Sequence, residues 1–256
     1  MIREGVILAA GLGTRLSAVS KGKPKFLVEV MGRPLVTYPV SFLKWLKVKK
    51  INIIVPYGWK KHAEDILNEF DLDIRIMEND KPERDNGYSF YLSKELVSSS
   101  KFILMMTDHV FSQKFLSSFI KRSRLNLDAD ILIAGDKNPK YVDIDEATKI
   151  YTTHDGRVIQ IGKELVSFDY IDTGLFIFDR RTYDVAEEVI EKKDVVKLAH
   201  IITEIASREN FDVRVVDVTG FIWTEIDTVE DYLSAHYDKK RKIIERIINK
   251  LRAVNV

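Results

Sequence analysis

Two glycines, an arginine and a group of lysines follow the first apolar segment of the chain. Gly11 and Gly13 come directly after residues 5–10, and Arg15 precedes the lysines of residues 21–25. Because glycine readily takes a positive φ, such a loop can bring backbone N–H groups close to an anion while fixed cations approach from the side. The stretch therefore predicts a phosphate-binding loop.

The spacing of these residues excludes two common nucleotide-binding motifs. A dinucleotide fingerprint requires a third glycine near position 16 and an acidic residue at the end of the second strand. The chain has Leu16, and that strand ends with Val55 and Pro56. The Gly-x4-Gly-Lys-Ser/Thr pattern of a Walker P-loop is also absent.

Two aspartates lie where they could join this loop. Asp108 ends the most apolar strand expected in the chain, residues 101–109, and Asp227 precedes the last expected helix. Open parallel sheets bind ligands beyond the carboxyl ends of their strands, so we expect Asp108 at the same edge as residues 11–25. The alternative is that Asp108 caps the helix that begins near Ser112.

The elements that must position these residues alternate between strands and helices. Residues 51–56 and 72–77 are expected strands, and residues 35–46 and 60–70 have helical periodicity. This β-α-β-α-β order implies a parallel sheet with right-handed crossovers. Further strands are expected at 130–134, 148–152, 158–162, 170–178 and 211–218, and further helices at 88–97, 111–122, 180–191, 197–207 and 228–251.

Composition limits the class of partner. The 256 residues carry 40 Lys and Arg against 39 Asp and Glu, so a net charge of +1 creates no global field toward nucleic acid. The absence of cysteine excludes disulfides and thiolate sites and fits a reducing cytosol. A charged fraction of 31% is typical of thermophile proteins. With no signal segment and no run of about 20 apolar residues, we expect one α/β domain in the cytoplasm.

The combined pattern resembles the sugar-1-phosphate nucleotidyltransferase family. The resemblance rests on Leu8-Ala-Ala-Gly-x-Gly-Thr-Arg15-Leu16 followed by Pro24-Lys25, on Thr107-Asp108, and on Ile226-Asp227-Thr228. It covers the chain from residue 5 to about residue 236. It implies a three-layer α/β/α, Rossmann-like fold with a mostly parallel mixed central sheet. It also implies Mg²⁺-dependent transfer of a nucleotidyl group with release of pyrophosphate.

The charged residues suit this chemistry on physical grounds. Nucleotidyl transfer places negative charge on phosphate oxygens and on the departing pyrophosphate, so catalysis depends on positioning and charge neutralisation. Arg15 offers a planar fork for the β- and γ-phosphates, and Lys25 a compact cation for the α-phosphate. Asp108 and Asp227 could hold Mg²⁺ together with water and phosphate. The alternative is that Arg15 and Lys25 are solvated loop charges.

By resemblance, the nucleotide contacts extend beyond these charges. Asn86, Gly87 and Ser89 are expected to join the backbone of Ala10 and Gly11 in contacting the base. A helix cap at this point is compatible with that role. The full set expected to bind the nucleotide is Leu8, Ala9, Ala10, Gly11, Leu12, Gly13, Thr14, Arg15, Lys25, Asn86, Gly87, Ser89, Thr107 and Asp108.

The second half of the chain resembles a narrower branch of the family. Residues 141–149, together with the segments around Lys163 and Asp172, look like the cytidylyltransferases that act on inositol-1-phosphate. This resemblance implies transfer of CMP from CTP to a small phosphorylated polyol. Lys149 and Lys163 are expected to contact the acceptor phosphate. Carboxylates accept paired hydrogen bonds from hydroxyls, and the expected polyol contacts are Asp143, Asp145 and Asp172.

Several alternatives stay open within this resemblance. The acceptor could be phosphocholine or a hexose-1-phosphate, and the nucleotide could differ. The family also includes catalytically dead regulatory subunits. Retention of Arg15, Lys25, Asp108 and Asp227 argues against a regulatory subunit.

The end of the chain is a basic amphipathic helix. Residues 239–252 place five isoleucine and leucine residues among lysines and arginines. We expect residues 1–236 to form the nucleotidyltransferase domain and residues 237–256 to extend it. The helix could pack on its own domain or on a sister subunit in a homodimer. The alternative is docking to a membrane surface or to the membrane-bound transferase that is fused to this domain in some members of the branch.

Overall fold

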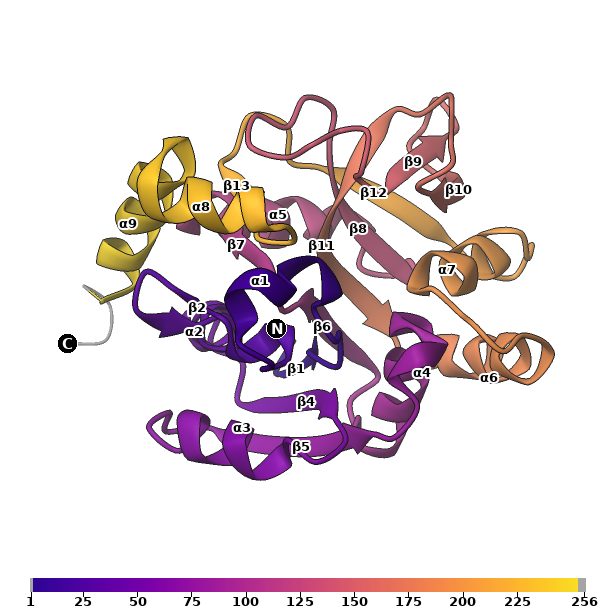
Figure 1. Cartoon of the computed structure of the whole chain (residues 1–256). Coiled ribbons are helices and arrows are strands. Elements are labelled where there is room, and N and C mark those ends of the chain that lie inside the picture. Colours follow the sequence, from indigo (N-terminus) through magenta and orange to yellow (C-terminus); the bar gives the residue numbers. More distant parts are fainter. Residues whose placement is uncertain (1, 253–256) are drawn as a thin grey trace.

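A nine-stranded sheet runs through the computed structural model, which describes residues 2–252 (Figure 1). Its strands are β1 (Glu4–Leu8), β4 (Lys50–Pro56), β5 (Asp73–Asn79), β6 (Lys101–Met106), β8 (Ile131–Asp136), β9 (Lys149–Thr152), β10 (Val158–Gly162), β11 (Tyr170–Asp179) and β12 (Val213–Asp217). The order is β10-β9-β11-β6-β1-β4-β5, and β8 lies between β11 and β12. Strands β6, β1, β4 and β5 are parallel, whereas β11 is antiparallel to both β6 and β8. The predicted mostly parallel mixed sheet is confirmed.

Helices cover both faces of the sheet and complete three layers (Figure 1). One face carries α2 (Thr37–Trp45), α3 (Lys60–Leu67), α5 (Gln113–Ser123), α8 (Val229–Tyr237) and α9 (Lys239–Arg252), and the other carries α4 (Asn86–Leu92), α6 (Thr182–Lys192) and α7 (Leu198–Ala206). The smaller elements are α1 (Ser17–Ser20), the pair β2 (Glu29–Val30) and β3 (Arg33–Pro34), the pair β7 (His109–Phe111) and β13 (Trp223–Glu225), and the 3₁₀ turns Thr14–Leu16, Lys25–Leu27, Pro82–Arg84, Ser93–Glu95 and Arg124–Asn126. Within residues 2–252 no helix is long and apolar enough to cross a membrane.

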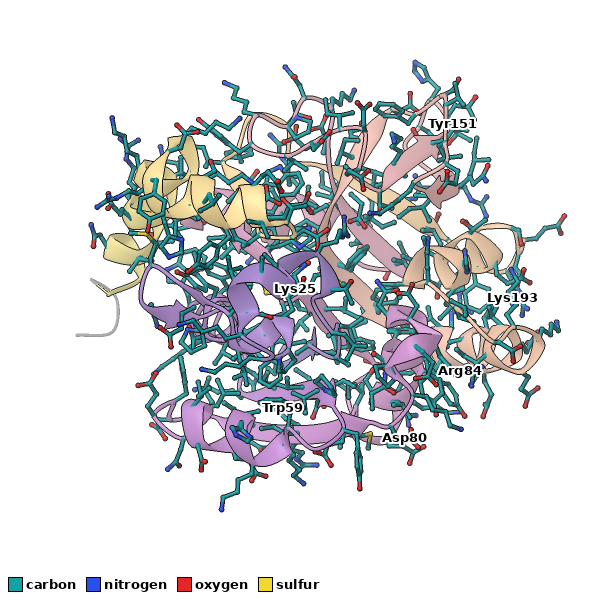
Figure 2. The ribbon with its side chains drawn as sticks, viewed as in Figure 1. Lys25, Trp59, Asp80, Arg84, Tyr151 and Lys193 are labelled. Carbon is teal, nitrogen blue, oxygen red and sulfur yellow. The ribbon has the colours of Figure 1, made fainter. Side chains whose placement is uncertain are left out.

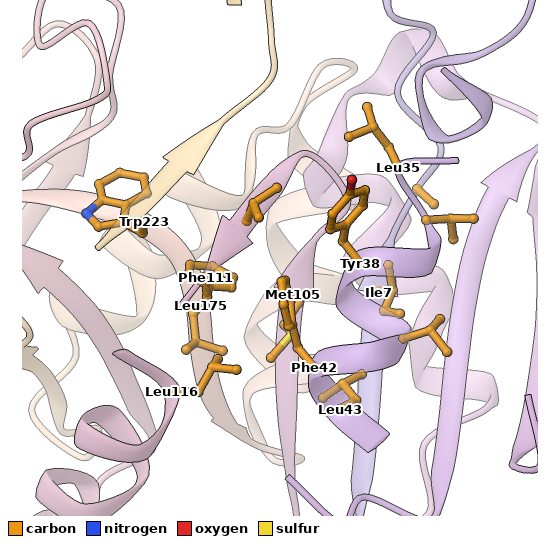
Figure 3. Close-up of a cluster of buried hydrophobic side chains, with 14 of the residues drawn as sticks. Ile7, Leu35, Tyr38, Phe42, Leu43, Met105, Phe111, Leu116, Leu175 and Trp223 are labelled. Carbon is orange, nitrogen blue, oxygen red and sulfur yellow. The ribbon is translucent and has the colours of Figure 1, made fainter. Parts of the chain in front are cut away.

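Helix α2 fixes the strand that leads into the phosphate-binding loop. Phe42 and Leu43 are fully buried, and the ring of Phe42 meets that of Phe111 edge-on at 5.7 Å (Figure 3). A Cβ on Gly5 would lie 2.7 Å from Leu43 Cδ1, so this close approach requires glycine in β1. Burial of each large apolar side chain contributes about 1.5–3 kcal/mol. The packing therefore holds β1, and with it the start of the loop, in one position.

An aromatic stack on the other face holds α4. The ring of Phe90 lies 4.7 Å from Tyr183 and 4.8 Å from Phe178, and Phe102 stacks on Tyr183 at 5.6 Å. Such pairs add about 0.5–1.5 kcal/mol beyond their buried area. The stack places the first turn of α4 at the carboxyl edge of the sheet, beside the loop after β1.

The clearest differences between the predicted and observed elements lie in the last helix and around residues 109–112. The single helix expected at 228–251 is broken at Asp238, whose extended φ of −136° and ψ of −149° separate α8 from α9. The break folds α9 back, so that Lys240 Nζ contacts Asp231 and donates to the carbonyl of Glu225 at 2.9 Å. A helix expected from residue 111 instead begins after Ser112, whose hydroxyl accepts from Phe115 N at 3.2 Å, because residues 109–111 pair with β13.

Candidate active site

The loop after β1 packs on the segment that carries Lys25. Gly13 takes φ 69°, and a Cβ on it would lie 2.9 Å from Lys25 Cβ, so glycine is required there. The expectation that both glycines use a positive φ holds for Gly13 and not for Gly11. Gly11 is exposed, and nothing lies within 4 Å of where its Cβ would be. Its backbone is therefore open to a ligand.

Lys25 brings two distant aspartates together in the interior of the molecule. Its Nζ contacts Asp108 and donates to Asp227 Oδ1 at 2.5 Å. Figure 2 shows Lys25 near the middle of the chain's fold, whereas Tyr151 and Lys193 lie at the periphery. Burial opposes the charge of Lys25, but the charges of Asp108 and Asp227 outweigh it and raise the pKa of the ammonium. The lysine is thus cationic at neutral pH.

Asp108 stays ionised for the complementary reason. Burial favours its neutral form, but Lys25 and His109 outweigh that effect and hold its pKa well below the usual range. Asp108 does not cap α5, because Ser112 performs that role. The carboxylate is therefore available to the site.

Arg15 lies at the mouth of the same cluster. One of its terminal nitrogens contacts Asp227, and the other lies 3.5 Å from Glu146 Oε2. Its side chain is 46% exposed, so both contacts are weakened by solvent. A bound triphosphate could displace these carboxylates at modest cost.

A cavity of about 370 Å³ opens between the loop after β1 and the start of α4. Its lining includes these residues of the predicted nucleotide-binding set: Leu8, Ala9, Ala10, Gly11, Leu12, Gly13, Thr14, Arg15, Lys25, Asn86, Ser89, Thr107 and Asp108. The remaining predicted member, Gly87, is buried outside this lining. Its N–H donates to Val196 O at 2.8 Å, and a Cβ there would lie 2.4 Å from that oxygen. A base contact by Gly87 stays a prediction.

The polar residues of α4 already have protein partners. Asn86 Oδ1 accepts from Leu198 N at 2.6 Å, which ties α4 to the start of α7. Ser89 Oγ accepts from Asn79 Nδ2 at 3.0 Å, and Asn79 is fully buried at the end of β5. The Asn86 amide nitrogen donates to no acceptor within residues 2–252, so it can donate to a base. Neither partner was expected from the sequence, because Leu198 lies 112 positions from Asn86, and Asn79, only 10 positions from Ser89, belongs to a different element.

A second cavity of about 460 Å³ adjoins the first. The two linings share Arg15, Asp85, Asn86, Met106 and Asp227. The predicted acceptor residues Lys163 and Asp172 line this second cavity.

The other predicted acceptor residues lie outside that lining. Lys149 is buried, and its Nζ donates to the carbonyls of Asp145 at 3.1 Å and Lys163 at 3.0 Å. Asp143 Oδ1 accepts from Asp145 N at 3.0 Å, so both belong to a turn at the surface. Lys149 therefore connects the turn to the loop of Lys163. Contacts of Lys149, Asp143 and Asp145 with an acceptor stay predictions.

Among the further ionisable residues that line the second cavity, His109, Glu225 and His200 have shifted pKa values and were given no catalytic role from the sequence. His109 Nδ1 is 2.6 Å from Asp108 Oδ1, and its Nε2 is 3.6 Å from Glu225 Oε2. Burial opposes the charge of His109, but Asp108 outweighs it and raises the imidazole pKa. Burial raises the pKa of Glu225, and burial lowers that of His200. His109 and Glu225 meet through the short pair β7 and β13, whose length gives no periodic signal in the sequence.

Burial also perturbs Asp172 in this wall. Desolvation raises the pKa of its carboxyl to about 6, although the N–H of Gly174 donates to its Oδ1 at 2.9 Å.

At the rim shared by both cavities, Asp85 takes φ 69° and ψ −177°, a conformation that non-glycine residues rarely adopt. Such perturbed groups concentrate at functional sites.

Asp108 and Asp227 are the candidate ligands for a divalent cation. Among the described residues, no group of three or more His, Asp and Glu side chains is arranged to hold a metal. Asp108 and Asp227 nevertheless both contact the ammonium nitrogen of Lys25. One small cation bound at that point would therefore be within reach of both carboxylates. Mg²⁺ is usually held by one or two carboxylates, with water and substrate phosphates completing its shell. The pair fits that mode of binding.

Fold and site together define a nucleotide-binding α/β protein with its ligand cavities at the carboxyl edge of a parallel sheet. The chain belongs to the nucleotidyl transferase family, whose model matches residues 4–242. Its enzyme class is therefore that of the nucleotidyltransferases.

Two curated relatives and one solved structure are informative. The chain is 36% identical to the bifunctional IPC transferase and DIPP synthase of Thermococcus kodakarensis, over 89% of this chain and 48% of that protein. It is 35% identical to the protein of the same name from Archaeoglobus fulgidus, over 92% and 43%. The chain thus spans about half the length of these relatives. The structure of the inositol-1-phosphate CTP transferase from T. maritima superposes with a TM-score of 0.86 at 28% identity, covering 98% of this chain and 96% of that one.

Proposed function

We propose that the protein transfers CMP from CTP to inositol-1-phosphate, giving CDP-inositol and pyrophosphate. The observation that carries the proposal is the pair of adjoining cavities that share Arg15 and Asp227. One is lined by the loop after β1, and the other by Lys163 and Asp172. The name of the T. maritima structure, an inositol-1-phosphate CTP transferase, supports CTP and inositol-1-phosphate as the substrates.

In the proposed reaction, an oxygen of the acceptor phosphate attacks the α-phosphorus of CTP, and the bond to pyrophosphate breaks. Lys25 neutralises the α-phosphate, and Arg15 holds the β- and γ-phosphates through its planar fork. Both cations exchange carboxylate partners for phosphate oxygens when CTP binds. Mg²⁺ held by Asp108 and Asp227 would add charge neutralisation at the phosphates. Asn86, Gly87 and Ser89 are the proposed contacts to the base.

The acceptor is proposed to lie in the second cavity. Lys163 faces it as the cation for the acceptor phosphate, and Asp172 as an acceptor for polyol hydroxyls. Lys149 supports the loop of Lys163 through its carbonyl contact at 3.0 Å. Because the attacking phosphate is ionised at neutral pH, the reaction requires no general base.

A panel of substrates tests this function. Pyrophosphate release is measured with each of four nucleoside triphosphates against inositol-1-phosphate, phosphocholine and glucose-1-phosphate. The proposal expects the highest kcat/KM for CTP with inositol-1-phosphate. Turnover with glucose-1-phosphate but none with inositol-1-phosphate would overturn the acceptor. No turnover with any pair, despite CTP binding, would favour a regulatory subunit.

The C-terminal helix is proposed to extend the same domain and to present a basic surface. Its buried Ile244, Ile247 and Ile248 join the core between α2 and α5, so its apolar side is already covered. Its exposed side carries Lys239, Arg241, Lys242, Arg246 and Lys250. We propose that this basic side, rather than the apolar one, docks to a membrane-bound transferase or forms a homodimer contact. A cytoplasmic location is proposed from the absence of cysteine.

A further inference from the structure

Glu225 presents a carboxylate to the second cavity without a hydrogen-bond donor. It lies in β13 directly opposite His109 of β7, and both side chains line the cavity. The nearest cationic atom, His109 Nε2, lies 3.6 Å from Glu225 Oε2, beyond hydrogen-bonding distance. Within residues 2–252 no donor is bonded to either carboxylate oxygen, although the side chain is only 19% exposed. The oxygens are therefore free to accept from a ligand.

The surroundings of Glu225 are fixed from three sides. The ring of His109 stacks on Trp223 with centroids 5.8 Å apart and an interplanar angle of 6°. Its Nδ1 is 2.6 Å from Asp108 Oδ1, and a Cβ on Gly174 would lie 2.9 Å from the ring. The stacking on Trp223 and the contact with Asp108 hold the imidazole in one orientation. It holds the wall beside Glu225 in one arrangement.

Asp172 supplies a second free acceptor in the same cavity. Its Oδ1 accepts from Gly174 N at 2.9 Å, whereas Oδ2 has no donor among the described residues. Asp172 comes from β11 of the central sheet, and Glu225 comes from the small β7–β13 pair. Two rigid elements therefore direct unused acceptor oxygens into one cavity.

We propose that Glu225 and Asp172 together bind hydroxyl groups of the acceptor and select a polyol phosphate over phosphates that lack hydroxyls. The inference rests on the proposed function, and it attributes the selectivity for the acceptor to these two carboxylates of the second cavity. Buried acceptors without donors are costly, so a ligand that supplies hydroxyl donors gains their hydrogen bonds. A ligand without them leaves these carboxylate oxygens desolvated and without a hydrogen-bond donor.

The lining argues against a quaternary ammonium acceptor. Cavities that recognise choline groups place the cation on the faces of several aromatic rings. Among the residues that the structure describes, the lining of the second cavity includes Phe176 but no Trp or Tyr. It also contains His109 and His200, whose ring N–H groups suit hydroxyl oxygens better than a cation. The lining therefore disfavours phosphocholine as the acceptor.

The test compares acceptors in the full chain and in Glu225→Gln. Kinetics are measured with CTP and inositol-1-phosphate, and cyclohexyl phosphate, a ring phosphate without free hydroxyls, is measured as a competitive inhibitor. Loss of a charged acceptor should raise the KM for inositol-1-phosphate at least about tenfold. The KM for CTP and the inhibition constant of cyclohexyl phosphate should change less than about twofold. Glu230→Gln, an exposed acid outside both cavities, is the matched control.

The outcomes separate this inference from the proposed function. If the wild-type chain does not use inositol-1-phosphate, the proposed function itself fails. If it does and Glu225→Gln leaves that KM unchanged, the inference is overturned. An equal rise in the inhibition constant of cyclohexyl phosphate would also overturn the inference, since that result indicates a distorted cavity. If thermal denaturation shows that Glu225→Gln is not folded, Asp172→Asn replaces it. The same rise in the KM for inositol-1-phosphate is expected for that variant.

Discussion

Lys25 and Asp227 are separated by 202 positions in the sequence and joined by a hydrogen bond of 2.5 Å between Nζ and Oδ1. The same ammonium contacts Asp108, so one buried cation holds together the loop after β1, the end of β6 and the segment before α8. A buried charge that loses its partner costs far more than a surface charge. Removal of any one of Lys25, Asp108 and Asp227 therefore leaves a buried charge with fewer partners.

Lys25→Met should abolish most turnover. The variant leaves the α-phosphate without its cation and leaves Asp108 facing Asp227 without compensation. We expect kcat for pyrophosphate release to fall by at least about 100-fold, the usual effect of removing a preorganised charge. Lys61→Met, at an exposed position of α3 outside both cavities, is the control and should stay near the wild-type rate. A Lys25→Met rate within about threefold of wild type would contradict the assignment.

Asp227→Asn should remove Mg²⁺-dependent activity while leaving the fold intact. The substitution keeps the shape of the side chain but removes one of the two carboxylates within reach of a shared cation. Turnover is measured across a Mg²⁺ titration, and circular dichroism reports the fold. Asp128→Asn, an exposed position far along the chain, serves as the comparison. Undiminished turnover would mean that the metal is held elsewhere.

The two lysines predicted for the acceptor should behave differently. Lys163 lines the second cavity, so Lys163→Met should raise the KM for the acceptor about tenfold with little change in melting temperature. Lys149 is bonded to two backbone carbonyls, so Lys149→Met should lower the melting temperature by several degrees. Steady-state kinetics and thermal denaturation of both variants decide the matter. Equal KM effects with unchanged melting temperatures would assign both lysines to the acceptor phosphate.

The sequence predicts the half of the site that is built from local segments. Residues 8–15 form one continuous loop after a buried strand, so their pattern alone indicates where they lie. The end of an apolar strand likewise locates Asp108. Such features depend on short-range order, which hydrophobic periodicity reports well.

The rest depends on contacts between distant segments. Glu225 reaches the second cavity only because three residues of β13 pair with β7, and so short a pair has no signature of its own. Lys149 resembles a ligand-binding cation in sequence, yet the fold places its ammonium on two carbonyls. Asp238 interrupts a continuous helical pattern because α9 must fold back to bury Ile244 and Ile247. Tertiary packing, rather than propensity, decides each of these positions.

The affinity for the acceptor should rise with pH through the ionisation of Asp172. Burial raises the pKa of this carboxyl to about 6, so it is mostly protonated at pH 5 and mostly ionised at pH 7. An ionised carboxylate accepts hydroxyl hydrogen bonds more strongly. We expect the KM for the acceptor to fall as pH rises through 6. The KM of wild type is divided by the KM of Asp172→Asn at each pH, which cancels the titration of the acceptor phosphate. A ratio that does not change with pH would contradict the prediction.

The same raised pKa has the opposite effect on stability. The unfolded chain ionises this carboxyl near pH 3.8 and the folded chain near 6, so unfolding releases a proton between those values. The contribution of Asp172 to the free energy of unfolding should therefore decrease as pH rises from 4 to 6. Urea denaturation of wild type and Asp172→Asn, compared at pH 4 and pH 7, measures this difference.

Glu4 should stabilise the fold in a pH-dependent way at the opposite end of the sheet. Burial raises the pKa of this carboxyl, but hydrogen bonds from Lys50, Ser99 and Asn52 outweigh that effect and lower it from 4.5 to about 2. Since the folded pKa is depressed, the stabilisation is complete above pH 4.5 and is lost as pH falls toward 2. A shift of this size corresponds to about 3 kcal/mol.

Glu4→Gln should accordingly lower the free energy of unfolding at pH 7 by about 2–3 kcal/mol. The difference from wild type should shrink as the pH is lowered from 4.5 toward 3, because the unfolded wild-type chain then protonates Glu4 whereas the folded chain keeps it ionised, so unfolding takes up a proton. Urea denaturation at pH 7, 5, 4 and 3 measures both chains, and Glu29→Gln at an exposed position provides the control. A loss of stability that is the same at every pH would show that Glu4 acts through its shape and neutral hydrogen bonds rather than its charge.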